Sequence, residues 1–207
     1  MRWAKTSITV NNQKEMFIPL LLSAGFFLGG LMLGAVILHT LSPLISQELQ
    51  RYLVSYIKAA SLYAEGSIPG FKNWLQISKM QTVSLGLLWV CGLTVVGSPF
   101  ISLIIGARGF VVGFTVGFLV QEEAGKGLLL AIAGVLPQNL CYIPAFLGAG
   151  ALAFYFSLNL MRFQGAFLRR IGVYSLFFLL FLLPVLLGAW LETYLAPGLL
   201  RLAISLF

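Results

Sequence analysis

The chain has 207 residues, of which 59% are hydrophobic and 9% are charged, and its mean hydropathy is +0.97. Soluble domains carry about 25% charged residues, so this composition excludes an ordinary water-soluble domain. The formal net charge is +7, but the basic residues are scattered and form no cluster, which argues against a nucleic-acid-binding surface. We therefore expect the lipid bilayer as a partner and no nucleic acid.

Long, uninterrupted apolar segments predict that the chain crosses the membrane as helices. Every backbone amide inside a bilayer must be hydrogen-bonded within the protein, so only helices or closed barrels can span it. Barrel strands would show alternating apolar and polar residues, which these segments do not. We expect an all-α integral membrane protein with about five transmembrane helices, and residues 1–207 as a single membrane domain.

The first apolar segment, Phe17–Leu38, is long enough to cross, because a helix rises about 1.5 Å per residue and the hydrocarbon core is about 30 Å thick. In residues 39–79, apolar positions recur at helical spacing after Ser42-Pro43, a typical helix start. We expect residues 39–79 to form an extracytoplasmic loop of amphipathic helices between spans one and two. Its apolar side is a candidate partner face, made of Leu49, Leu53, Tyr56, Ile57, Phe71 and Trp74.

Span two is expected from Met80 to Gly97, where a glycine, a serine and a proline end it. The stretch Phe100–Ala107 is too short to cross again before Arg108, so we interpret it as interfacial or re-entrant. Span three then runs from Gly109 to just before Gln121. The alternative is a turn at Pro99 that leaves Arg108 in mid-membrane, where an unpaired charge costs at least about 2.5–3.5 kcal/mol; for this reason we prefer the first interpretation.

The segment from Gly127 to Leu160 is too long for one straight span, which predicts a broken fourth helix. The break is expected at a polar site within this apolar run, made of Pro137, Gln138, Asn139 and Pro144. One interpretation is that the two amides satisfy backbone carbonyls freed by proline. The other is a substrate or ion site at a discontinuous helix, as in transporters. The first is favoured, because no acidic residue accompanies the amides in the sequence.

Span five is expected over Ile171–Leu191, followed after Pro197 by a C-terminal piece lying on the membrane surface. Basic residues before spans one and five lie on short segments, and short basic segments stay in the cytoplasm. We therefore expect a cytoplasmic N-terminus and an extracytoplasmic C-terminus.

Small residues at a spacing of four predict close helix packing, because such residues let backbones approach each other in lipid. The pattern serves packing within one chain and homo-oligomerisation equally well. The predicted helix-packing residues are Gly25, Gly29, Gly30, Gly34, Gly109, Gly113, Gly117, Ala145, Ala149 and Ala153.

Residues for chemistry are scarce. The sequence has one histidine, no aspartate and none of the common nucleophile, phosphate-loop or zinc motifs. We therefore expect no enzymatic activity, no cofactor and no metal.

Several strings of the sequence, taken in order, resemble the stage II sporulation protein M family: Leu41-Ser42-Pro43, Gly109–Val120, Leu136–Asn139, Ile143-Pro144-Ala145 and Glu192–Pro197. The resemblance implies a multi-pass protein of the bacterial plasma membrane that acts in forespore engulfment at the mother-cell septal membrane. It also implies two membrane-anchored partners, the peptidoglycan hydrolases called stage II sporulation proteins D and P. A non-catalytic scaffold that recruits and holds these enzymes is our leading hypothesis. The alternative is a permease-like transporter subunit with a pathway near the broken fourth helix.

Overall fold

The structure, a computed structural model, describes residues 13–40, 70–160 and 167–205, together with residues 45, 47–51 and 55. The elements defined within these ranges are all helical. They are α1 (Gln13–Ile37), the 3-10 turn η1 (Leu38–Thr40), α3 (Phe71–Gly92), α4 (Gly97–Gly134), α5 (Leu136–Asn159), α6 (Phe167–Trp190), the π-helical turn η4 (Leu191–Leu195) and α7 (Ala196–Ser205).

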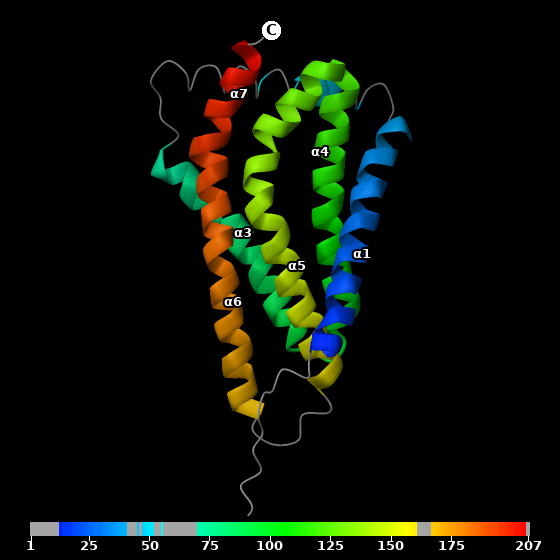
Figure 1. Cartoon of the computed structure of the whole chain (residues 1–207), viewed down its shortest axis with the longest axis vertical. Helices are drawn as coiled ribbons and strands as arrows, with labels where there is room; N and C mark the ends of the chain where they lie inside the picture. The colour runs from blue at the N-terminus through cyan, green and yellow to red at the C-terminus, as the bar shows by residue number, and fades with distance from the viewer. Residues whose placement is uncertain are drawn as a thin grey trace, which may run out of the picture.

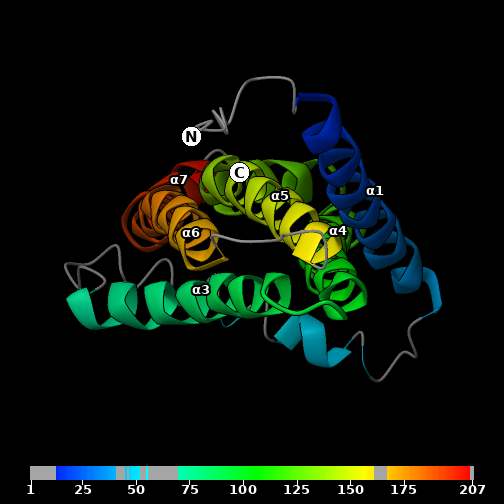
Figure 2. The same ribbon diagram turned by 90° about the horizontal axis from the view of Figure 1, so that it is seen from below.

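Successive helices run in alternating directions through one bundle (Figure 1). α1 rises, α3 descends obliquely, α4 rises, α5 descends, and α6 continued by α7 rises again. Seen from below, α5 lies in the middle, flanked by α1, α3 and α6 (Figure 2). The start of α1 and the end of α7 therefore lie at opposite ends of the bundle.

Four described segments are long and apolar enough to cross a membrane: Met16–Thr40, Gly97–Gln121, Leu136–Asn159 and Leu168–Ala203. A shorter apolar helical segment, Gly125–Gly134, precedes α5. α3, which contains most of predicted span two, is not among the four, and its first half carries Lys72 and Lys79. The prediction of an all-helical membrane protein is thus confirmed. The prediction of about five spans would additionally require α3 to cross.

The expected interfacial piece Phe100–Ala107 does not exist as a separate element. α4 begins at Gly97 and continues through Arg108 without interruption, so the preferred interpretation of this region was wrong. Arg108 lies near the middle of the candidate span Gly97–Gln121, as the alternative requires. Pro99 lies in the first turn, where a missing backbone N–H breaks no helical hydrogen bond. Ile101 and Ile105 are completely buried in the main core, which holds this stretch inside the bundle.

α4 bends back on itself near its upper end (Figure 1). Gly127 contacts the backbone carbonyl of Leu119, eight residues earlier, an approach that a straight helix would not allow. The last part of α4 therefore descends together with α5. The predicted break of the fourth helix is present between Gly134 and Leu136, where Pro137 lies in the first turn of α5. Pro144 lies inside α5 without ending it.

The sequence predicts a separate surface piece after Pro197, but the structure shows no separate element there. α7 continues α6 through η4, so that Leu168–Ala203 forms one long apolar segment. Leu200 and Ala203 of α7 are buried against Leu119 and Leu130 of α4. These contacts attach the end of the chain to the bent part of α4.

Candidate functional site

α1 and α4 are joined by a glycine interface, which we define as Gly30 and Gly34 of α1 with Gly109, Gly113 and Gly117 of α4. A Cβ atom at Gly30 or Gly34 would overlap backbone carbonyl oxygens of α4, and one at Gly109 or Gly113 would overlap those of α1. At Gly117 a Cβ atom would lie 2.7 Å from Leu38. The two backbones are therefore in direct contact, as expected for small residues at a spacing of four.

The other small residues named from the sequence divide into two groups. Ala145, Ala149 and Ala153 of α5 are buried in the main core. Gly25 and Gly29 are exposed on α1, and a Cβ atom at either would meet nothing within 4 Å. These two glycines take no part in packing within the described chain, so a role for them in oligomerisation stays a prediction.

The two amides at the helix break hydrogen-bond to backbone carbonyls. Gln138 donates through Nε2 to the Gly134 carbonyl at 2.5 Å, and Asn139 donates through Nδ2 to the Val135 carbonyl at 2.7 Å. Gly134 is the last residue of α4, and Val135 is the single residue between α4 and α5. The arrangement matches the structural interpretation, in which side-chain amides serve carbonyls at a broken helix.

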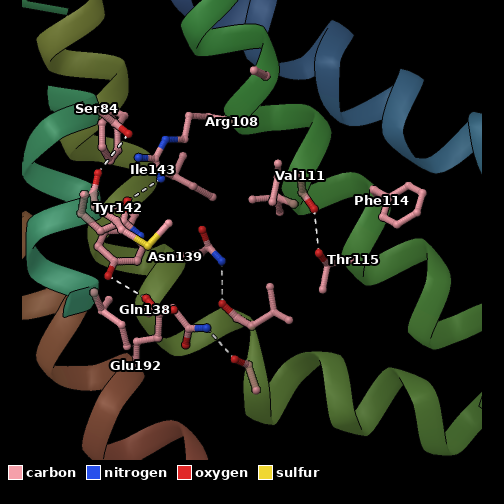
Figure 3. A pocket seen from close by; sticks show the side chains of 18 of the residues that line it. Ser84, Arg108, Val111, Phe114, Thr115, Gln138, Asn139, Tyr142, Ile143 and Glu192 are labelled. Atoms are coloured by element: carbon pink, nitrogen blue, oxygen red, sulfur yellow. Dashed lines mark hydrogen bonds between the residues drawn. The ribbon is translucent and has the colours of Figure 1, made fainter. Parts of the chain in front are cut away.

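A polar cluster lies beside the break, and we define it as Gln81 of α3, Arg108 of α4, Tyr142 of α5 and Glu192 of η4. Arg108 donates to the Gln81 side-chain oxygen at 2.5 Å, and its guanidinium lies 4.1 Å from the centre of the Phe146 ring. The Tyr142 hydroxyl donates to the Glu192 carboxylate at 2.8 Å. Four elements thus each contribute one side chain to the cluster, and Figure 3 labels three of them, Arg108, Tyr142 and Glu192.

Opposite charges balance within the polar cluster. Arg108 and Glu192 attract each other electrostatically, and Arg108 also interacts with Tyr142. Ionisable residues at membrane depth are costly and are normally paired inside a bundle or a cavity. Glu192 enters the site from a π-helical turn, a distortion that often accompanies functional sites.

The polar cluster and the helix break border one cavity of about 890 Å³. Most of its walls come from α3, from α4 and from the first half of α5, and they are mostly aliphatic and aromatic. Single residues from other parts of the chain complete the lining: Phe27, Leu49, Glu192 and Leu200. Figure 3 shows Gln138 and Asn139 on one side and Val111 and Thr115 across from them. A concave, mainly apolar space with a few converging polar groups is the usual form of a ligand site. Among the described residues, no three histidine, cysteine, aspartate or glutamate side chains could hold a metal ion together.

Comparison with known families identifies the chain. The family model described as stage II sporulation protein M matches residues 23–197, which include the glycine interface, the helix break and the polar cluster. The chain belongs to the stage II sporulation protein M family. No match was found among curated proteins or among solved structures. As a member of the stage II sporulation protein M family with four long apolar helices, it is a multi-pass membrane protein related to sporulation.

The structure of this stage II sporulation protein M relative describes only part of the candidate partner face. Phe71 is 68% exposed and its ring centre lies 5.3 Å from that of the half-buried Trp74. Leu49 is half-buried and lines the cavity, so it does not lie on an open surface. Leu53, Tyr56 and Ile57 lie outside the described residues.

The polar cluster was not predicted from the sequence. Its members are separated by up to 111 positions, between Gln81 and Glu192, and no spacing rule connects them. A usable signal was present, since Arg108 and Glu192 are each an isolated charge in an apolar run, and such a charge predicts a partner elsewhere in the bundle.

Proposed function

We propose that this protein is a non-catalytic membrane scaffold of the engulfment machinery, which recruits and holds the peptidoglycan hydrolases, stage II sporulation proteins D and P, at the mother-cell septal membrane. The family match over residues 23–197 is the observation that carries the proposal. The contacts of the described helices are also consistent with a scaffold, because backbone contact at the glycine interface makes a rigid support.

The proposed docking element is residues 39–79, which comprise the segment between α1 and α3 and the first part of α3, on the extracytoplasmic side. α1 ends at the top of the bundle, and α3 begins in the upper half of the bundle (Figure 1). The exposed Phe71, next to Trp74, offers an apolar surface at the start of α3. Aromatic side chains of this kind are common anchors in protein interfaces. The N-terminus would accordingly be cytoplasmic.

The alternative function is a permease-like subunit with a pathway near the helix break. One observation favours it: Glu192, which is remote in sequence, borders the same cavity as Gln138 and Asn139. The cavity thus has an acidic group beside the amides, which the sequence alone did not indicate. Transporter sites are commonly built at discontinuous helices in this way.

Two sets of substitutions separate these functions. A scaffold predicts that polar changes on the partner face, Phe71→Glu or Leu53→Glu with Ile57→Glu, release the hydrolases while membrane abundance stays normal. Asn139→Ala should instead lower abundance modestly, because it removes one hydrogen bond, to the Val135 carbonyl, and a single hydrogen bond contributes only about 0.5–1.5 kcal/mol. The protein that accumulates should still retain its partners.

The measurements are membrane abundance, co-purification of the two hydrolases and completion of engulfment. Lys72→Glu, a change at an exposed position next to Phe71, controls for added negative charge. If the Asn139→Ala protein is abundant and bound to its partners but inactive, the scaffold proposal is wrong and the permease is favoured.

A further inference from the structure

The turn between α3 and α4, residues 93–96, is both apolar and exposed. Val95 is 49% exposed and Val96 is 70% exposed. The sequence contains no charged residue from position 80 to position 107. Turns that lie in water are normally rich in glycine, proline, asparagine, aspartate and serine, and the four residues of this turn include none of these. The composition of the turn is therefore unfavourable for a position in water.

The contacts of the turn place it level with the membrane-crossing parts of its neighbours. The Ser157 hydroxyl donates a hydrogen bond to the Thr94 carbonyl at 2.8 Å. Ser157 lies within the candidate span Leu136–Asn159, and the candidate span Gly97–Gln121 begins directly after the turn. Figure 1 shows that α6, which has the exposed Arg169 in its first turn, begins below the point where α3 ends. The turn therefore stops short of the charged end of the bundle.

Two backbone N–H groups of the turn need an acceptor from outside the chain. The N–H groups of Leu93, Thr94 and Gly97 each donate to the backbone carbonyl three residues earlier. Those of Val95 and Val96 donate to no residue in the part of the chain that the structure describes. Unsatisfied backbone groups are not found exposed to the hydrocarbon of a bilayer. Apolar side chains together with free donors therefore fit the boundary between lipid headgroups and acyl chains, where ester carbonyls can accept.

We infer that the α3–α4 turn docks into the lipid bilayer, at the boundary between the headgroups and the acyl chains of one leaflet. The side chains of Val95 and Val96 lie among the first acyl carbons. Phe100, one turn into α4 and also exposed, continues this apolar surface toward the middle of the membrane. α3 consequently ends inside the lipid and does not emerge into water at this end of the bundle. The scaffold function does not enter this inference, which rests on the turn alone.

The position of a nitroxide spin label at Val96→Cys tests the inference. The label is attached to the full-length protein without Cys91 and Cys141, in nanodiscs of phosphatidylethanolamine and phosphatidylglycerol. Its collisions are measured with oxygen, which concentrates in lipid, and with a nickel chelate, which stays in water. The ratio of oxygen to nickel collisions should be higher at Val96→Cys than at the exposed Arg169→Cys. It should be highest at Leu103→Cys, which is exposed about two turns further along α4.

Two results of this measurement would overturn the inference. A ratio at Val96→Cys equal to that at Arg169→Cys would place the turn in water. Few collisions with either agent would show that protein, such as a second copy of the chain, covers the turn.

Substitutions at the turn give an independent check. Val96→Asp places a charge in lipid and should lower the abundance of the protein in the membrane, whereas the matched change Val96→Leu should leave it at the parent level. Leu168→Asp, at the exposed start of α6 next to Arg169, should also be tolerated. Equal abundance of the Val96→Asp and Leu168→Asp proteins would contradict a position of the turn in lipid.

Discussion

Arg108 of α4 donates a hydrogen bond to the side-chain oxygen of Gln81 in α3, and the two atoms are 2.5 Å apart. This bond turns the guanidinium into the bundle, where it lies over Phe146 and interacts with Glu192. An unpaired charge inside a bilayer is strongly unfavourable. The contacts with Gln81, Phe146 and Glu192 therefore explain how α4 can carry an arginine half-way along its membrane-crossing part.

Replacing Arg108 with leucine should destabilise the protein, although leucine is the more apolar residue. The change leaves the Glu192 carboxylate without the opposite charge with which it interacts, and an uncompensated charge inside a bilayer costs at least about 2.5–3.5 kcal/mol. We expect a lower unfolding temperature in detergent and reduced abundance in the membrane. Arg169→Leu, the same change at an exposed position, should have little effect.

A double substitution checks the reason for this loss. When Arg108→Leu is combined with Glu192→Leu, no uncompensated charge is left, so the double variant should be more stable than Arg108→Leu alone. If the two losses simply add, Arg108 and Glu192 do not compensate each other and our account of the polar cluster is incorrect.

Alanine substitutions in α1 should distinguish packed glycines from exposed ones. A methyl group at Gly34 would overlap the backbone of Phe110 in α4, whereas one at Gly29 meets no atom within 4 Å. Gly34→Ala should therefore cost about 1–3 kcal/mol of stability through overpacking, and Gly29→Ala should be neutral or slightly stabilising, because alanine is the better helix former.

The unfolding temperature of each purified variant measures the difference. A similar loss for Gly29→Ala would indicate that the exposed face of α1 is also an interface, in this case between copies of the chain. Crosslinking of the parent protein in membranes would then be expected to give dimers.

The structural features that could be predicted from the sequence are those that depend on residues close together in the chain. The four-residue spacing of Gly109, Gly113 and Gly117 indicated close packing, and their contacts with α1 follow the same spacing. Pro137, after a long apolar run, indicated the break before α5. The small size of glycine decides the first feature, and the backbone restriction of proline decides the second.

The mistakes share a different cause. Arg108 was assigned to a membrane interface because its stabilising partner, Gln81, comes from another helix and no local rule reveals that contact. The C-terminal segment after Pro197 was expected on the membrane surface. Proline is tolerated in the first turn of a helix, and the burial of Leu200 and Ala203 against α4 decides its position. Tertiary contacts overrode the local signal in both cases.

Accessibility of single cysteines should establish the orientation. The test uses a variant without Cys91 and Cys141. A cysteine at the exposed position His39 directly follows α1, which ends at the top of the bundle, and one at the exposed Leu158 lies near the end of α5, which ends at the bottom (Figure 1). A membrane-impermeant maleimide should label His39→Cys in intact cells and Leu158→Cys only after permeabilisation. The reverse pattern would place the N-terminus outside.

The π-helical turn should set the rotational position of α7. η4 accommodates one more residue per turn than a regular helix would, and the burial of Leu200 and Ala203 depends on the direction in which α7 leaves it. Deleting Leu195, which is 41% exposed, should convert the turn to regular α-helix. The residues that follow would then rotate by about 100° and shift by about 1.5 Å.

This deletion should lower the unfolding temperature, because Leu200 would leave its buried position against Leu119 and Leu130 of α4. Inserting one alanine directly after Gly198 in the deletion variant restores the original rotation of Leu200. Gly198 has no neighbour within 4 Å of an added Cβ atom, so the insertion itself meets no obstacle, and it should recover most of the lost stability. Glu192 precedes the deleted residue and keeps its place relative to α6, so recovery of stability reports on α7 and not on the polar cluster. A deletion variant as stable as the parent would show that the π-helical turn is not required for the packing of α7.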